Sequence, residues 1–354
     1  MIRLDDLPYP IIIDFDSQVH LVEIVKARGA RAVVLCDRNV ETRAQRLARA
    51  IGAPLATFAL GERRKRLRIV EEVLDTMIEL GADRETIVVG VGGGVAGDVF
   101  GFAAGIYMRG VRFVNVATSL VAMVDAAIGG KTGVDLRGGK NLAGVFRDPI
   151  AVLCDIGALK TLPDRQLREG MAEVVKHGII EGGEVFAHLE ELAAHELRRW
   201  PWEVVVAEQI KVKVMVVAED RLEAGRREVL NLGHTFAHAI ERASSYRISH
   251  GEAVAVGLRA AGLLALRCDR FSREEHLRVL SLLALLDLPL SLSSTCGPEI
   301  VPAMTTDKKT RNGHLRFVLP RKIGDVEFGV RVPLPSVRAV VKSLWNEPGS
   351  RELR

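Results

Sequence analysis

The segment TIVVGVGGGVAGDVFGFAAGIYMRGVRFVNVA, residues 86–117, decides the fold class of this sequence. It joins two β-branched runs through a glycine-rich turn and a segment of helical character. The alternation extends back along the chain, where RAVVLC precedes ETRAQRLARAIG and PLATFAL precedes RKRLRIVEEVLDTMIELGA. Strand-like and helix-like segments that alternate in this way predict a parallel sheet covered by helices.

Beyond Pro163 the pattern changes to long amphipathic segments, such as RQLREGMAEVVKHGII and EVVVAEQIKVKVMVVAED, with one late hairpin candidate, HLRFVLPRKIGDVEFGV. The chain has 354 residues, which is more than a single hydrophobic core usually supports. We therefore predict an α/β domain over residues 1–162 and a mainly α-helical domain over residues 163–354. Ligands usually bind where two such domains meet, or at the carboxyl ends of parallel strands.

The bulk composition excludes several classes of protein. The formal charge is +4 and basic residues are interleaved with acidic ones, so nucleic-acid binding is not indicated. The four cysteines form no CxxC pair, which argues against a disulfide framework and a cysteine zinc site. No segment has the pattern of an export signal or of a membrane span. We expect a cytoplasmic protein that binds neither nucleic acid nor membranes.

The glycines of GVGGGVAGD, residues 90–98, allow backbone N–H groups and the N-terminus of the next helix to approach a phosphate. Gly92, Gly94 and Gly97 match the pattern GxGxxG, although glycine-rich turns between strand and helix are common for packing reasons alone. The turn also follows the third or a later strand, and no acidic residue follows it at the distance of the usual dinucleotide fingerprint. The motif alone therefore does not establish a dinucleotide site.

Polar side chains at the ends of two earlier strand-like runs favour a nucleotide site. CDRNV places Asp37 and Asn39 after one run, where a carboxylate can accept hydrogen bonds from ribose hydroxyls. GERRK places Glu62 and Lys65 after the next run. Each residue alone is as readily a turn residue or a solvated helix start. Combined with the glycine turn, they predict that a nucleotide binds here.

Three of the nine histidines lie in NLGHTFAHAIERASSYRISHGE, residues 231–252. His234 and His238 are spaced i, i+4 on a predicted helix, so periodicity alone makes both candidate metal ligands. His250 lies in SHGE, a capping-box pattern that places it in the first turn of the next helix. MAEVVKHG supplies Glu173, and one carboxylate with two imidazoles is a common catalytic zinc set.

The remaining charged residues predict an anion cradle. Residues 107–141 combine small side chains, which allow close approach to a ligand, with cations that would neutralise a phosphate or carboxylate. The candidates in this segment and elsewhere are Arg109, Asp125, Lys131, Lys140, Asn141, Lys213, Arg227, Asn231, Lys308 and Lys309. For the histidines in charged segments without such partners, we expect packing or surface hydrogen bonds: His188, His195, His276 and His314.

These motifs together resemble the 3-dehydroquinate synthase family of the shikimate pathway. The resemblance covers roughly nine tenths of the chain, in the family's order, through CDRNV, GERRK, GVGGGVAGD, YMRG, MVDAAIGGKTGVD, GGKN, LKTLP, MAEVVKHG, VVAEDR, NLGHTFAHAIE, SHGEAVAVG and TTDKK. It implies a Rossmann-like NAD-binding α/β domain and an α-helical metal-binding domain. It also implies one tightly held NAD, one divalent metal ion, zinc or cobalt, and a homodimer.

Carried over position by position, the resemblance implies Glu173, His234 and His250 as metal ligands, and it makes His238 a substrate-site residue instead of a ligand. The implied NAD contacts are Asp37, Asn39, Glu62, Lys65, Gly93, Gly94, Asp98, Thr118, Ser119, Lys140 and Thr161. The implied substrate contacts are Asp125, Lys131, Asn141, Lys176, Lys213, Arg227, Asn231, His238 and a lysine of the Lys308–Lys309 pair, taken as Lys309, with Arg109 directed to a neighbouring subunit. Ser119, Asp135, Ala126 and Ala127 depart from the residues that are usual in the family.

The implied reaction converts 3-deoxy-D-arabino-heptulosonate 7-phosphate (DAHP), a phosphorylated sugar acid, into 3-dehydroquinate and phosphate. A different sugar phosphate cyclase, acting for example on sedoheptulose 7-phosphate, ranks lower because KTGV, GKN, RxxLN and DKK have the form associated with the carboxylate substrate. A glycerol-dehydrogenase-type alcohol dehydrogenase would share the glycine turn and metal histidines but lack the phosphate-binding lysines. A pseudoenzyme is the least favoured alternative, since every implied site residue is chemically competent.

Overall fold

The computed structural model describes residues 1–292, 296, 299–305 and 315–348. The chain forms two compact units. The first consists of Met1–Pro163 with Pro201–Val214, and the second of Asp164–Trp200 with Met215–Arg354. Helix α7, Trp202–Glu219, therefore begins in the first unit and ends in the second.

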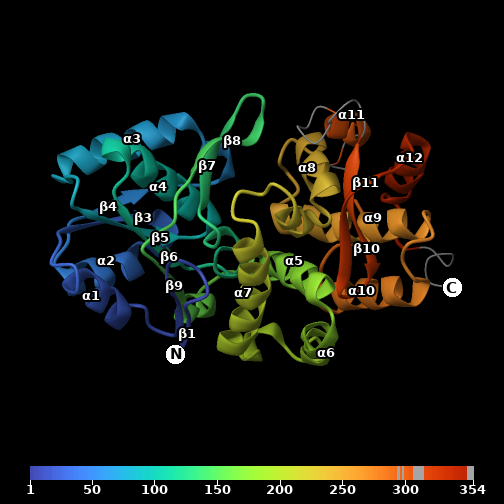
Figure 1. The fold of residues 1–354 in the computed structure, drawn as a ribbon, viewed down its shortest axis with the longest axis horizontal. Coiled ribbons are helices and arrows are strands. Elements are labelled where there is room, and N and C mark those ends of the chain that lie inside the picture. The colour runs from blue at the N-terminus through green and yellow to red at the C-terminus, as the bar shows by residue number, and fades with distance from the viewer. Residues whose placement is uncertain (293–295, 297–298, 306–314, 349–354) are drawn as a thin grey trace. The chain divides into compact units, whose positions relative to one another are not determined.

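A seven-stranded sheet forms the centre of the first unit, with strand order β1-β2-β9-β6-β5-β3-β4 (Figure 1). In that order the strands are Ile2–Leu4, Ile11–Asp14, Ala151–Asp155, Arg112–Ala117, Ile87–Gly92, Ala32–Asp37 and Leu55–Phe58. All neighbouring pairs are parallel except β1 and β2, which pair antiparallel at one edge. The predicted parallel sheet is thus confirmed, with one antiparallel edge strand.

Helices cover both faces of this sheet, and the strands are apolar on both sides for that reason. Along β3, Val33 and Leu35 enter a core with helices α3 and α4, whereas Val34 and Cys36 enter a second core with α1 and α2. Figure 1 shows the two helix pairs on opposite faces. The helices are α1 (Gln18–Lys26), α2 (Glu41–Ile51), α3 (Leu67–Glu79) and α4 (Gly94–Ile106).

A second feature of this unit is a β-hairpin that the sequence patterns do not predict. After a π-helical turn at Ala122–Ala126, strands β7 (Lys131–Leu136) and β8 (Gly139–Phe146) pair antiparallel. The hairpin packs on α4, where a side chain at Gly101 would lie 2.5 Å from Thr132 Cγ2. The absence of a side chain at Gly101 therefore allows α4 and β7 to pack closely.

The second unit is mainly helical, as expected, and includes the predicted late hairpin. Its helices are α5 (Asp164–Glu181), α6 (Gly183–Leu192), α8 (His234–Ala243), α9 (His250–Leu266), α10 (Arg273–Leu285), α11 (Ile300–Thr305) and α12 (Leu334–Ser343). Strands β10 (Arg316–Lys322) and β11 (Asp325–Arg331) form the hairpin. Among the described residues, no helix is both long and apolar enough to cross a membrane.

Helix α9 is the central element of this unit and packs against α5, α8, α10, α12 and β10. It approaches its neighbours closely because three of its residues, Gly251, Gly257 and Gly262, have no side chain. A Cβ at Gly257 would overlap the carbonyl of Gly233, and a Cβ at Gly251 would overlap the backbone of Glu169, with 2.6 Å to its Cα. The start of α9 is therefore held directly against α5.

We predict that Gly251→Ala destabilises the protein by about 1–3 kcal/mol, because the added methyl group forces the two backbones apart. The free energy of unfolding in urea measures this effect. Gly225→Ala is the matched control, since no atom lies within 4 Å of its added Cβ. Equal stabilities of the two variants would show that α9 tolerates displacement.

The burial of His276, on α10, predicts that the stability of the folded protein depends on pH. His276 is fully buried, its ring lies against Gly262, and its nitrogens accept or donate no hydrogen bond among the described residues. Burial, reinforced by the charge of Arg259, lowers the pKa of His276 from 6.5 to about 4. The folded state thus binds fewer protons than the unfolded state between these values, and stability falls as the pH drops from 6.5 toward 4.

From this shift we expect the parent protein to lose about 2 kcal/mol more stability than His276→Leu between pH 7 and pH 5. Urea unfolding at both pH values, with a chelator present throughout, measures the difference. The exposed His195→Gln variant should keep the parent's pH dependence. Parallel curves for the parent and His276→Leu would contradict the prediction.

Candidate active site

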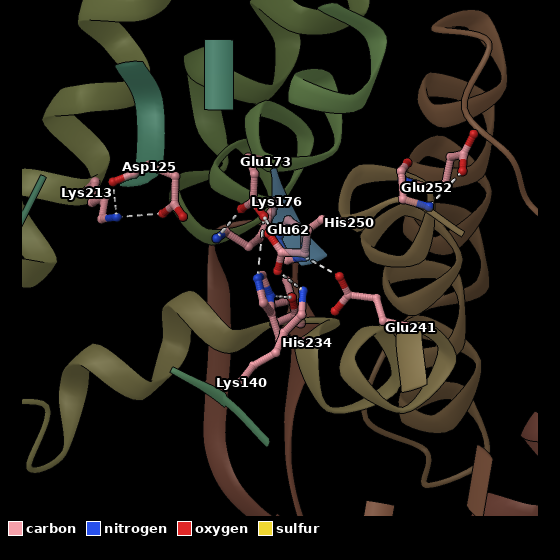
Figure 2. Close-up of polar contacts among 12 residues, drawn as sticks. Glu62, Asp125, Lys140, Glu173, Lys176, Lys213, His234, Glu241, His250 and Glu252 are labelled. Atoms are coloured by element: carbon pink, nitrogen blue, oxygen red, sulfur yellow. Dashed lines mark hydrogen bonds and ion pairs between the residues drawn. The ribbon is translucent and has the colours of Figure 1, made fainter. Parts of the chain in front are cut away.

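Three side chains of the second unit converge on one point (Figure 2). Glu173 extends from α5 and is fully buried, while His234 and His250 are the first residues of α8 and α9. Nε2 of His250 lies 3.2 Å from Glu173 Oε1, and Nε2 of His234 lies 3.4 Å from the same oxygen. The three donor atoms lie within 4.8 Å of one another, so they could hold a metal ion.

Each histidine has a partner on its other ring nitrogen. His234 Nδ1 lies 3.1 Å from the carbonyl oxygen of Leu232, and His250 Nδ1 lies 3.3 Å from Glu241 Oε1. An N–H donated from Nδ1 leaves the lone pair of Nε2 for a cation, which is the usual arrangement of metal-binding histidines. The donor set and its outer partners therefore fit a divalent metal ion such as zinc.

Local sequence explains why the histidines are presented in this way. Ser249 caps α9: its hydroxyl accepts the N–H of Glu252, and Glu252 Oε2 accepts the N–H of Ser249. This capping box, expected from SHGE, makes His250 the first helical residue. At α8, Gly233 adopts a φ of +78°, a left-handed conformation that glycine enters without strain.

Charge is concentrated around Glu173. Burial disfavours its ionised form, but the ammonium of Lys176, one turn along α5, and the two imidazoles outweigh that effect and hold the pKa of Glu173 well below its usual range. Burial likewise opposes the charge on His250, yet its contacts with Glu173 and Glu241 raise its pKa to about 10. His250 must therefore release a proton before Nε2 can bind a metal ion.

Two further residues of α8, His238 and Glu241, lie near the proposed metal ligands. The ring of His238 lies 5.5 Å from that of His234 and 6.4 Å from that of His250, measured between centroids. It is not part of the donor group formed by Glu173, His234 and His250. Glu241, which the sequence analysis did not single out, lies seven residues after His234 and so on the same face of α8. That spacing could have identified it.

Arg227 and Asn231 lie in the short helical segment Arg226–Asn231 that precedes α8. Arg227 is buried, and its Nη1 donates to the carbonyl of Arg221 at 2.6 Å. Asn231 Nδ2 donates to Glu223 Oε1 at 3.1 Å, and Glu223 has a φ of +58°. The sequence analysis did not identify Glu223, because an acidic residue in a polar turn carries no distinguishing pattern.

In the first unit, the predicted nucleotide residues gather at the carboxyl ends of neighbouring strands. Asp37 ends β3 and its Oδ1 accepts the N–H of Asn39 at 2.8 Å. Gly93 lies between β5 and α4, Gly94 is the first residue of α4, and a Cβ at Gly93 would lie 3.1 Å from Ser119 Oγ. Thr118 also follows β6 directly. The glycine turn is therefore flanked by polar side chains, as the sequence predicts.

Lysines and carboxylates form a cluster beside this edge. Lys65 Nζ lies 2.5 Å from Asp98 Oδ2 and donates to Asn141 Oδ1 at 2.6 Å. Lys140 Nζ lies 2.5 Å from Glu62 Oε1. Burial disfavours the charge on Lys65, but the carboxylates of Asp98 and Glu62 outweigh that effect and raise its pKa. The structure thus brings five of the predicted residues together.

Four other predicted residues are not among the ion pairs and hydrogen bonds of this cluster. Lys213 of α7 donates to Asp125 Oδ1 at 2.6 Å, and Lys131 Nζ lies 5.9 Å from the ring of Phe146. Arg109 is exposed beyond the C-terminus of α4, about 20 Å from the glycine turn at 1.5 Å per residue.

Thr161 follows the short helical segment Ile156–Lys160 directly. Thr161 Oγ1 donates to the carbonyl of Ala158 at 3.1 Å. Lys308, Lys309 and His314 lie outside the described residues.

Comparisons with known proteins agree with the motifs. The family profile for the 3-dehydroquinate synthase N-terminal domain matches residues 55–169, and the profile for the C-terminal domain matches residues 170–310. The 3-dehydroquinate synthase of Rhodopirellula baltica is 45% identical over 81% of this chain and 78% of its own length. The 3-dehydroquinate synthase of Gloeobacter violaceus is 42% identical over 95% of this chain and 96% of its own.

A solved structure extends the similarity to the whole fold. ValA, the 2-epi-5-epi-valiolone synthase of Streptomyces hygroscopicus subsp. jinggangensis, was determined with NAD+ and Zn2+ bound. It matches with a TM-score of 0.86 and 29% identity over 96% of this chain and 98% of ValA. The family resemblance and the predicted fold class are both confirmed. This chain belongs to the 3-dehydroquinate synthase family.

Proposed function

We propose that this protein is a 3-dehydroquinate synthase that converts DAHP into 3-dehydroquinate and phosphate with one NAD and one divalent metal ion, zinc or cobalt. The observation that carries this proposal is the convergence of Glu173, His234 and His250 in a chain of this family. The ValA structure, which contains NAD+ and Zn2+, supports the choice of cofactors. A cytoplasmic location, a homodimer and the absence of nucleic-acid or membrane partners stay predictions from the sequence.

The metal ion would be held by Glu173, His234 and His250. Bound NAD would supply reversible hydride transfer and the cation a Lewis acid, which together allow phosphate elimination, re-reduction and intramolecular aldol cyclisation of DAHP. The protein's part is to keep both Nε2 atoms directed at Glu173 Oε1 through the Nδ1 contacts. Lys176 compensates the buried charge of Glu173.

The NAD contacts that we propose lie in the first unit. The N-terminus of α4 and the glycine turn present N–H groups suited to the pyrophosphate. Carboxylates at strand ends, above all Asp37, would accept hydrogen bonds from ribose hydroxyls. The full proposed set is Asp37, Asn39, Glu62, Lys65, Gly93, Gly94, Asp98, Thr118, Ser119, Lys140 and Thr161.

The substrate contacts that we propose are mostly cationic or amide side chains, because DAHP carries a phosphate and a carboxylate. Arginine and lysine bind such groups through charge-assisted hydrogen bonds and hold the substrate in one conformation. In the first unit the set is Asp125, Lys131, Asn141 and Lys213. In the second unit it is Lys176, Arg227, Asn231 and His238, with Lys309 from the sequence resemblance. Arg109 is assigned to the neighbouring subunit of a homodimer.

A second candidate is another sugar phosphate cyclase. The similarity to ValA, a synthase of a different product, shows that this scaffold supports more than one cyclisation. Sedoheptulose 7-phosphate, which lacks the carboxylate of DAHP, distinguishes the two candidates when both substrates are offered to the same preparation.

We expect the metal-loaded protein with NAD to release phosphate from DAHP without net accumulation of reduced nicotinamide, and a chelator to abolish this release. Glu173→Ala should lower the rate by on the order of 10³-fold, because losing the metal removes several kcal/mol of charge stabilisation. Phosphate and nicotinamide absorbance are followed together.

The matched control is Glu181→Ala, an exposed residue on the same helix, which should keep full activity. Phosphate released only from sedoheptulose 7-phosphate would favour the alternative cyclase. Reduced nicotinamide that accumulates with a simple polyol would favour a dehydrogenase.

We further expect Glu241→Gln to weaken metal binding about 10- to 100-fold, since the carboxylate that orients His250 is lost while its shape is kept. Titration of the metal-free protein with zinc by calorimetry measures the affinity. Glu191→Gln, an exposed change on α6, provides the control. An affinity within twofold of the parent would show that the negative charge of Glu241 does not contribute to metal binding.

A further inference from the structure

Asp135 occupies an irregular position in the β7–β8 hairpin. The register between the two strands shifts between Val134 and Leu136, so Asp135 lies at a bulge. Its carboxylate is buried, with 6% of the residue exposed, and its Oδ1 accepts the backbone N–H of Asn141 at 2.8 Å. Asn141 has a φ of +52°, in the left-handed region, which residues other than glycine adopt uncommonly and asparagine more readily than most.

The backbone of Asp135 makes a second contact, on the other side of the bulge. Its N–H donates to the carbonyl oxygen of Lys65 at 2.8 Å, and an isolated parallel bridge joins it to Arg66. The side chain of Lys65 returns to the hairpin, where Nζ donates to Asn141 Oδ1 at 2.6 Å. Asp135, Lys65 and Asn141 thus form a closed ring of three hydrogen bonds.

This ring joins residues with different proposed partners. Lys65 and the adjacent Lys140 belong to the proposed NAD contacts, and each is ion-paired, with Asp98 and Glu62 respectively. Asn141 belongs to the proposed substrate contacts. Because Lys140 and Asn141 are consecutive in β8, the bond to the N–H of Asn141 restrains the peptide group that joins them.

We propose that Asp135 is a positioning residue, which holds Asn141 in its left-handed conformation and thereby orients Lys65 and Lys140 for NAD and Asn141 for the substrate. This inference rests on the proposed function. The role requires an acceptor oxygen at this position, because the partner is a neutral N–H. Asparagine, which keeps that oxygen and removes the charge, should therefore replace aspartate. Alanine, which removes the acceptor, should not.

The test compares the full-length parent with Asp135→Ala and Asp135→Asn in NAD binding by calorimetry and in steady-state kinetics with DAHP. We expect Asp135→Ala to raise both the Kd for NAD and the KM for DAHP by roughly tenfold or more, because one residue orients both sets of contacts. Asp135→Asn should stay within about threefold of the parent in both. Gly138→Ala, in the same hairpin and in ordinary van der Waals contact with Leu142, should change neither.

A merely structural role gives a different result. A partly unfolded population lowers the number of binding sites and the apparent kcat while Kd and KM stay unchanged, and that outcome would overturn the proposal. A Kd for NAD in Asp135→Asn as weak as in Asp135→Ala would also overturn it, since charge and not the acceptor would then matter. If Asp135→Ala does not fold by circular dichroism, Asp135→Glu, which displaces the acceptor, takes its place with the same expected rise.

Failure of this proposal can be distinguished from failure of the proposed function. A parent protein that neither binds NAD nor releases phosphate from DAHP contradicts the proposed function itself. A parent that does both, with an Asp135→Ala variant whose Kd and KM lie within twofold of it, contradicts only the role of Asp135.

Discussion

The constraint on which the second unit depends is the burial of the Glu173 carboxylate. An ionised carboxylate in an apolar interior is expensive unless cations and hydrogen-bond donors surround it. The chain meets this requirement with Lys176 from the same helix and with two imidazoles at the starts of α8 and α9. The helices must therefore approach closely, which accounts for glycines at Gly251 and Gly257 where side chains would overlap neighbouring backbones.

The first unit also compensates buried charge with opposite charge, at the carboxyl ends of its sheet strands. Lys65 is buried and its charge is stabilised by Asp98, while Lys140 pairs with Glu62. In both units a buried charge is stabilised by polar groups from a different element, so the position of each functional group depends on tertiary packing. A charge that is already desolvated and oriented needs little reorganisation when a ligand binds, which is the general advantage of preorganised sites.

Sequence periodicity predicts the parts of this fold in which burial is regular. The alternating segments before residue 160, the helices after Pro163 and the capping box before His250 are all confirmed. Periodicity does not predict the β7–β8 hairpin, because β8 is largely solvent-accessible and contains two glycines, and so lacks a period-two apolar pattern.

Periodicity also makes His238 a ligand candidate, since it cannot show which residue on a helix face meets Glu173, 61 or more residues away in the chain. The family resemblance supplied that choice, and Glu241 was found only from its contact with His250.

The three proposed metal ligands differ in exposure, and this difference explains where orienting contacts are needed. The side chain of Glu173 is fully buried, that of His234 is 10% exposed and that of His250 is 35% exposed. Burial restrains Glu173 and His234 in addition to their polar contacts, whereas an imidazole with a third of its surface accessible depends more on such contacts. His250 is also the ligand with a carboxylate on its second nitrogen and a capping box before it. The most accessible ligand thus has two local restraints, which keep its Nε2 directed at Glu173.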